Sequence, residues 1–165
     1  MSTIDFKSEL EKLAAQSKKA ARKLASLSTV RKNQALEAIA TALFENQQSI
    51  IEANALDLQA ARENGLSPAM IDRLALTEER IGDMAKGLSM VAGLQDPVGK
   101  IESNFIRPNG LVIEKIRVPI GVIGIIYESR PNVTVDAAGL CLKAGNTVIL
   151  RGGKEAIHSN RKLAE

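Results

Sequence analysis

Two polar stretches near the carboxyl end of the chain hold the residues whose types and spacing could bind a charged ligand. The first is the turn 127–132 (YESRPN), which follows the apolar run 121–126 and combines a carboxylate, a hydroxyl, a guanidinium and an amide. The second is the loop 151–154 (RGGK), which follows the apolar run 147–150. This loop could hold a phosphate, because glycines let a ligand approach the backbone and cations give charge-assisted hydrogen bonds. The candidate residues are Ser129, Arg130, Asn132, Arg151, Gly152, Gly153 and Lys154.

Each stretch also has an ordinary structural explanation. The RGGK loop could be a turn between a strand and a helix, with its arginine and lysine in solvent. In the YESRPN turn, Ser129 or Asn132 could accept hydrogen bonds from the first N–H groups of the next helix. Spacing alone favours these structural explanations over ligand binding.

Other kinds of site have no pattern in this sequence. Gly121 and Gly124 are spaced GxxG inside an apolar run, so there is no GxGxxG turn, and the phosphate-binding GxxxxGK[ST] motif is absent. His158 has no metal-ligand cluster around it, and no Ser/His/Asp set is recognisable. Cys141 stands between two leucines on a small-residue helix, which predicts a buried, inert thiol.

The elements that must position the two polar stretches form a βαβ unit. Uncharged runs at 121–126 and 147–150 flank a helical segment, 133–143, which the sequence Ala-Gly-Asn ends. This pattern predicts two parallel strands in a sheet that is buried on both faces. Ligands of open α/β sheets bind outside the carboxyl ends of the strands, which is where both polar stretches lie.

The upstream part, residues 1–95, has a helical apolar period throughout. It predicts helices over 5–25, 30–45, 50–63, 68–74 and 78–94. The expected capping residues are Ser28 or Thr29, Ser67 and Thr77, with a left-handed stop at Asn64-Gly65.

Residues 96–118 change from a helical to an alternating period. Strands over 100–107 and 111–118 around a Pro-Asn-Gly turn predict a hairpin arm. Neither face of the arm is cleanly apolar, so it could pair with another subunit or cover its own domain, and the sequence favours neither.

Composition is typical of a soluble protein of the reducing cytoplasm. The 165 residues are 45% hydrophobic and 25% charged, with a formal net charge of +3 and one cysteine. Scarce aromatic residues and scattered cations give little support to nucleic-acid binding. No signal peptide opens the chain, and no apolar run approaches the ~20 residues that span a bilayer.

Residues 155–165 resemble the start of an unfinished helix. We therefore expect this chain to be the amino-terminal part of a longer protein.

Residues 118–160 resemble the aldehyde dehydrogenase superfamily, and within it the gamma-glutamyl phosphate reductase branch. The superfamily's Pro-x-Gly-Val-x-Gly strand and Ala-Gly-Asn-(Thr/Val)-Val segment correspond to Pro119, Gly121, Gly124 and 144–148 here. The YESRPN turn replaces the superfamily's Pro-Trp-Asn, and RGGK replaces Lys-Pro-Ser-Glu; both replacements are similar to the reductase branch. The resemblance covers essentially the whole chain.

The resemblance implies an α/β fold in which amino-terminal helices and a hairpin arm lead into an incomplete Rossmann-like domain of aldehyde dehydrogenase type. Residues 1–95 would be the helical part of the cofactor domain, and 96–118 an arm with an oligomerisation role. Residues 119–165 would be the first βαβα half of the NADP-binding domain, truncated.

The resemblance also implies a reaction, the NADPH-dependent reduction of L-glutamyl 5-phosphate to L-glutamate 5-semialdehyde and phosphate in proline biosynthesis. Arg151 corresponds to the lysine that the superfamily places on the adenosine ribose, and Lys154 would meet the 2′-phosphate of NADP(H). Ser129, Arg130 and Asn132 fall in the substrate and oxyanion region. The nucleophilic cysteine of the family lies further along the chain and Cys141 does not match it, so no catalytic residue is expected within these 165 residues and no activity from them alone.

The partners implied by the resemblance are the substrate, further copies of the complete enzyme, and a functional link to glutamate 5-kinase. No metal, nucleic acid or membrane is expected. Two other interpretations remain open: another acylating aldehyde dehydrogenase, and a naturally short, non-catalytic interaction module.

Overall fold

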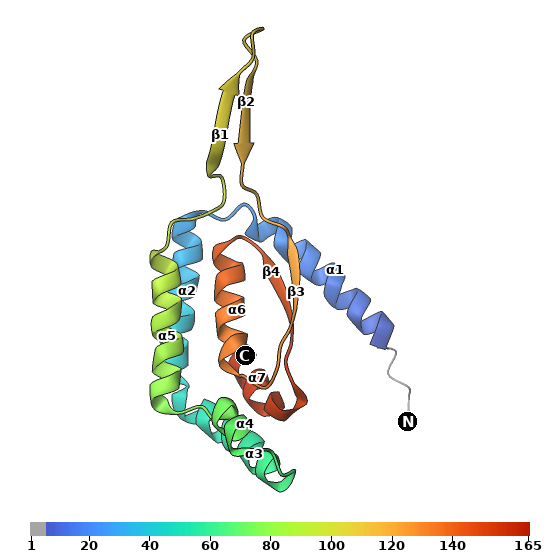
Figure 1. Cartoon of the computed structure of the whole chain (residues 1–165), viewed down its shortest axis with the longest axis vertical. Helices are drawn as coiled ribbons and strands as arrows, with labels where there is room; N and C mark the ends of the chain where they lie inside the picture. The colour runs from blue at the N-terminus through green and yellow to red at the C-terminus, as the bar shows by residue number, and fades with distance from the viewer. Residues whose placement is uncertain (1–5) are drawn as a thin grey trace.

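The computed structural model describes residues 6–165, and Figure 1 shows its helical layer, its parallel strand pair and its projecting hairpin. The amino-terminal helices are α1 (Phe6–Leu24), α2 (Thr29–Glu45), α3 (Gln47–Glu63), α4 (Pro68–Leu74) and α5 (Glu78–Gly93). The hairpin consists of β1 (Ile101–Ile106) and β2 (Val112–Ile116). The remaining elements are β3 (Val122–Ile126), α6 (Asn132–Lys143), β4 (Thr147–Arg151), the 3₁₀ turn η1 (Lys154–Ala156) and α7 (Ile157–Ala164).

The helices begin and end close to where the sequence predicts. Ser28, Ser67 and Thr77 each accept a hydrogen bond from the backbone N–H three residues on, which satisfies a donor that the first helical turn leaves free. Gly65 has a φ of 69°, which confirms the predicted left-handed stop after α3.

The hydrophobic core lies among α2, α5 and α6. These helices pack against one another, with α6 between the α2–α5 pair and the strands (Figure 1). The core is aliphatic, as the composition requires, and its buried members are Leu36, Ala40, Leu43, Ile50, Leu76, Ile81, Met84, Ala85, Leu88, Ala92 and Val135. Full burial of one such large side chain contributes about 1.5–3 kcal/mol.

Strands β3 and β4 form the predicted parallel pair, with α6 as the crossover helix. The register places Val122 opposite Thr147 and Ile126 opposite Arg151. The expectation that both faces are buried is wrong for residues 6–165. The strands are mostly half-buried, and Ile126 is 82% exposed, because within this length α1 and α6 are the helices that pack on the two strands to any extent.

Helix α1 also departs from expectation. Its predicted apolar stripe is largely exposed, with Phe6 at 72%, and Ala21 is its one buried residue. The helix crosses the strands obliquely near its carboxyl end, where Thr147 donates a hydrogen bond to the carbonyl of Ser17 (Figure 1).

The hairpin projects away from the rest of the molecule, and every residue of β1 and β2 is exposed (Figure 1). Glu102 links the two strands through ion pairs with Lys115 and Arg117, each 2.7 Å long. Hydrogen bonds from these two cations lower the pKa of Glu102 to about 2, so it stays ionised across the physiological range.

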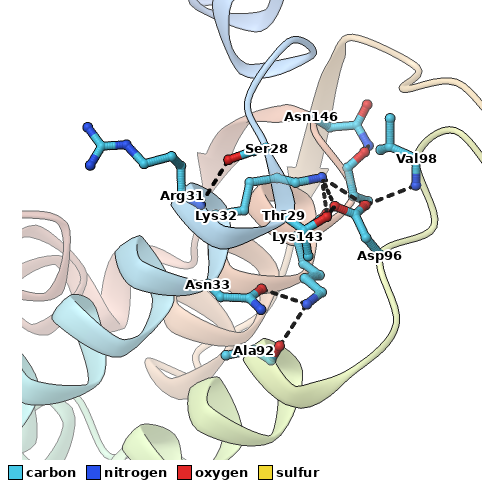
Figure 2. A network of polar contacts seen from close by, with 11 residues as sticks. Ser28, Thr29, Arg31, Lys32, Asn33, Ala92, Asp96, Val98, Lys143 and Asn146 are labelled. Carbon is cyan, nitrogen blue, oxygen red and sulfur yellow. Dashed lines mark hydrogen bonds and ion pairs between the residues drawn. The ribbon is translucent and has the colours of Figure 1, made fainter.

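Two buried lysines connect the core helices to the chain that leads into the hairpin (Figure 2). Lys32, 1% exposed, forms an ion pair of 2.6 Å with Asp96 and donates to the carbonyl of Lys143 at 3.1 Å. Lys143, 4% exposed, donates to Asn33 Oδ1 and to the carbonyl of Ala92, both at 2.7 Å.

Asp96 is held in its charged form inside this network. Burial disfavours the carboxylate, but hydrogen bonds from Lys32, Thr29 and the N–H of Val98 outweigh that effect and lower the pKa of Asp96. Because the folded pKa is below the unfolded one, the resulting stability is complete above the ordinary pKa of about 4. It is lost as the pH falls through the folded value.

Asp96→Asn is therefore expected to lower the free energy of unfolding by about 2 kcal/mol at neutral pH, because it leaves the buried Lys32 ammonium without its counter-ion. The difference from the unaltered chain should shrink on acidification. Urea unfolding at neutral pH and well below pH 4 measures both effects. Asp83→Asn is the control, because its ion pair with Lys86 is solvent-exposed and is worth less than about 1 kcal/mol. Equal losses in the two variants would contradict the prediction.

Candidate functional site

The two predicted polar stretches lie side by side at the carboxyl ends of β3 and β4. The register pairs the last residues of these strands, and the N–H of Tyr127 donates to the carbonyl of Arg151 at 3.1 Å. The turn 127–132 and the loop 151–154 therefore begin next to each other. This is the edge of a parallel sheet at which α/β proteins bind ligands.

Ser129 joins the turn to the loop. Its hydroxyl donates to Glu155 Oε2 at 2.8 Å, directly after the RGGK segment. Hydrogen bonds from the backbone N–H of Glu155 and from Ser129, together with the charge of Lys154, lower the pKa of Glu155. The two predicted sites are thus held against each other by a charge-assisted hydrogen bond.

The alternative in which Ser129 or Asn132 caps the next helix is wrong. Pro131 occupies the capping position of α6, and no side chain accepts a hydrogen bond there. Asn132 instead is the first residue of the helix, and its amide donates to Asp136 Oδ2 at 3.2 Å.

Gly152 and Gly153 are closely packed against side chains of the protein itself. A Cβ atom on Gly152 would lie 2.3 Å from Asn160 Nδ2 and 3.0 Å from the ring of Tyr127. One on Gly153 would lie 2.8 Å from Ser129 Oγ. The sequence suggested that these glycines let a ligand approach the backbone. In the structure they let the turn 127–132 and α7 approach the loop closely.

A chain of hydrogen bonds runs behind the loop and ties three elements together. Tyr127 Oη lies 2.6 Å from Thr134 Oγ1, and Thr134 donates to Asn160 Oδ1 at 3.0 Å. The Tyr127 hydroxyl is therefore the donor of the first bond, because the single proton of Thr134 is already used. This arrangement fixes the end of β3, the start of α6 and α7 relative to one another.

Arg151 and Lys154 both line one surface hollow of about 440 Å³ beside the strands. Arg151 and Lys154 are exposed, and among residues 6–165 neither side chain has a hydrogen-bond or ion-pair partner. Arg161 of α7 lines the same hollow and adds a third cation, which the sequence interpretation missed. The hollow can hold an anion such as a phosphate ester.

Arg130 and Asn132 belong to a different hollow, on the side of the turn that faces α4 and α5. Arg73 of α4 and Asp136 of α6 also line it, and the sequence analysis identified neither residue. Burial raises the pKa of the Asp136 carboxyl, while the hydrogen bond from Asn132 opposes this effect only in part. Ser129, Arg130 and Gly153 line a third hollow between the first two. The predicted substrate region and cofactor loop are therefore contiguous.

Cys141 is buried and has no role at these hollows. Burial raises the pKa of its thiol, which opposes formation of the reactive thiolate, as the sequence predicts. Among residues 6–165, no cluster of histidine, cysteine and acidic side chains could hold a metal ion. None of the helices described in this range is both long enough and apolar enough to span a membrane.

Tyr127→Phe is expected to lower the free energy of unfolding by about 1 kcal/mol, because the buried Thr134 hydroxyl loses its donor. Urea unfolding measures this loss. The control is Thr41→Val, which removes an exposed hydroxyl bonded to a carbonyl of its own helix and should change stability by less than about 0.5 kcal/mol. An unchanged stability in the Tyr127 variant would show that the hydrogen-bond chain does not hold the loop.

Residues 5–165 match the aldehyde dehydrogenase family. The chain is 59% identical over 155 residues to gamma-glutamyl phosphate reductase of Moorella thermoacetica and 61% identical over 155 residues to that of Carboxydothermus hydrogenoformans. Each match covers 94% of this chain and 37% of the relative. The chain thus spans a little over a third of the length of the curated relatives that it matches.

Solved structures agree with the sequence matches and confirm the predicted fold class. The crystal structure of gamma-glutamyl phosphate reductase from Thermotoga maritima matches with a TM-score of 0.91 and 47% identity, covering 94% of this chain and 37% of that one. The Saccharomyces cerevisiae reductase matches with a TM-score of 0.89 and 36% identity, covering 93% and 39%. The predicted resemblance is therefore confirmed along nearly the whole sequence. The chain belongs to the aldehyde dehydrogenase family.

Proposed function

We propose that this chain is the part of a cytoplasmic gamma-glutamyl phosphate reductase that carries the amino-terminal helices and the first half of the cofactor site. The proposed reaction is the NADPH-dependent reduction of L-glutamyl 5-phosphate to L-glutamate 5-semialdehyde and phosphate in proline biosynthesis. The observation that carries the proposal is the 55–61% identity to relatives of that name over 92–98% of the chain.

The chemistry needs groups beyond those in residues 6–165. A cysteine thiolate would displace phosphate from the acyl carbon, and a nicotinamide cofactor would supply the hydride that reduces the thioester to the aldehyde. Cys141 is unsuited to this role because it is buried and its pKa is raised. The nucleophile is therefore expected in the further length that the relatives have.

The proposed contribution of this chain to cofactor binding is the loop 151–154 with its adjoining hollow. Arg151 would contact the adenosine ribose, and Lys154 would meet the 2′-phosphate. The support is that both cations line one hollow at the end of β4 and that neither side chain has a hydrogen-bond or ion-pair partner among residues 6–165. A dianionic 2′-phosphate would neutralise the charge gathered there, which favours NADPH over NADH.

The competing proposal of a different acylating aldehyde dehydrogenase has weaker support. The acetylating aldehyde dehydrogenase of Geobacillus thermoglucosidasius matches at 16% identity with a TM-score of 0.60, so it shares the fold alone.

The proposed substrate is a reactive acyl phosphate, which a phosphoryl transfer to glutamate must supply. This requirement supports a functional link to glutamate 5-kinase.

The complete enzyme containing this chain is expected to oxidise NADPH when supplied with L-glutamyl 5-phosphate and to release one phosphate per NADPH. The loss of nicotinamide absorbance and a phosphate assay measure the two products. Lys154→Gln should weaken NADPH binding about tenfold and leave NADH binding nearly unchanged, because only the 2′-phosphate contact is removed.

Arg151→Gln provides the internal comparison, because the ribose is common to both cofactors and both affinities should fall. Turnover with acetyl-coenzyme A but not with L-glutamyl 5-phosphate would contradict the proposed reaction. Equal losses of NADPH and NADH affinity in the Lys154 variant would contradict the assignment of the 2′-phosphate contact.

We also propose that the hairpin pairs with another copy of the enzyme. In support, every residue of β1 and β2 is exposed, and large apolar side chains of the arm are exposed by half or more, with Phe105 at 50%, Ile106 at 73% and Val112 at 56%. The complete enzyme is expected to sediment as an oligomer, and Phe105→Lys combined with Val112→Lys should shift it toward the monomer. A complete enzyme that is monomeric before substitution would overturn this proposal.

A further inference from the structure

Two arginines from distant parts of the sequence border the same pair of hollows. Arg73 lies on α4 and Arg130 in the turn between β3 and α6, and both line the hollow against α5 and the neighbouring one that reaches Gly153. Within residues 6–165, neither guanidinium group has a hydrogen-bond or ion-pair partner. They are therefore free to bind a ligand group.

The third arginine of this region is already engaged. Arg80 forms an ion pair of 2.8 Å with Asp72 and donates to the carbonyl of Ala75 at 2.9 Å, which fixes the turn between α4 and α5. This arginine holds α4, and so Arg73, in place relative to α5. Its charge is not available to a ligand.

The acidic side chains of the two hollows also fall into those that have an ion-pair partner and those that have none. Asp72 and Asp83 have cationic partners, and Glu155 accepts from Ser129. Glu128, Asp136 and Glu155 have no ion-pair partner among residues 6–165, and the side-chain partners of Asp136 and Glu155 are a neutral amide and a neutral hydroxyl. The side chains of the two hollows that lack ion pairs are thus two cations and three carboxylates. A ligand that carries both signs of charge suits them better than a pure anion.

We propose that Arg73 and Arg130 bind the carboxylate of an α-amino-acid group, and that Asp136 binds its ammonium, so that this region takes the amino-acid head of the substrate. The inference rests on the proposed function, in which the substrate is a glutamate derivative. A guanidinium fork matches the two oxygens of a carboxylate, and an ionised carboxylate suits an ammonium group. A phosphate dianion at the same place would be repelled by Glu128 and Asp136.

The arrangement also gives the substrate a direction. Arg130 lines both hollows, and the second of them extends to Gly153 and Ser129, where the turn contacts the proposed cofactor loop. An amino acid held by its head at Arg73 and Arg130 would point its side chain toward that loop. The phosphorylated end of the substrate would then lie nearest the proposed cofactor.

The test is a calorimetric titration of the complete enzyme that contains this chain with L-glutamate, with glutarate as the ligand that lacks the ammonium group. L-glutamate is expected to bind at a single site per chain. Arg73→Gln and Arg130→Gln should each weaken its binding at least about fivefold. Asp136→Asn should weaken L-glutamate binding and leave glutarate binding unchanged or stronger.

Arg107→Gln is the matched control, because Arg107 is an exposed arginine on the hairpin with no side-chain partner within residues 6–165. It removes the same charge and should leave L-glutamate binding unchanged. Binding that is absent, or that is equally strong in the Arg73 variant and the control, would overturn the inference. Displacement of L-glutamate by equimolar inorganic phosphate would also overturn it and assign the two arginines to the phosphoryl group.

The complete enzyme separates this inference from the proposed function on which it rests. If it reduces L-glutamyl 5-phosphate and Arg73→Gln leaves the KM for that substrate unchanged, the subsite fails and the proposed function stands. If the complete enzyme does not reduce the acyl phosphate but binds L-glutamate through Arg73, the proposed function fails and the amino-acid subsite stands.

Discussion

The buried ammonium groups of Lys32 and Lys143 determine how the core helices meet. Each lysine donates to a carbonyl at the end of a helix: Lys143 to Ala92 at the end of α5, and Lys32 to Lys143 at the end of α6. These carbonyls have no partner within their own helices, and the helix dipole makes that end negative. Burying an ammonium group is costly, so the contacts must be complete, and every buried side-chain nitrogen and oxygen among the described residues has a partner. The orientation of α6 follows from this requirement.

The contacts of the two buried lysines and the candidate site lie at opposite ends of α6. The buried lysines fix its carboxyl end, while its amino end continues directly from the turn 127–132. A second buried network, around Asp57, holds α7 on the other side of the loop 151–154. Asp57 of α3 accepts hydrogen bonds from the N–H groups of His158 and Ser159, so a carboxylate from one helix caps the start of α7. The turn 127–132 and α7, which lie on either side of the loop 151–154, are thereby anchored to the helical layer. The amino-terminal helices therefore act as the support that holds the sheet edge in place.

Sequence patterns predicted most of the local structure and little of this support. Ser28, Ser67 and Thr77 were predictable caps because the hydroxyl and its N–H partner are three residues apart. The buried roles of Lys32 and Lys143 were not predictable, because the polar groups they contact are 64 and 110 residues away or belong to the backbone. A lysine in an amphipathic helix is ordinarily on its solvated face. The same limit applied to Arg73, which lines the same two hollows as Arg130 only in the folded chain.

The glycines of the RGGK loop have a packing role beside the ligand-binding role that the sequence suggests. The charges and glycines of the loop marked it as a phosphate-binding candidate, and both glycines lie where Tyr127, Ser129 and Asn160 pack closely against them. These two roles are compatible. Packing that admits no Cβ holds the loop backbone rigidly, and a rigid loop presents Arg151 and Lys154 to a ligand with less loss of conformational entropy on binding. The bond from Ser129 to Glu155 extends this rigidity to the neighbouring turn. A ligand bound at either stretch would therefore meet a surface whose geometry the other stretch helps to fix.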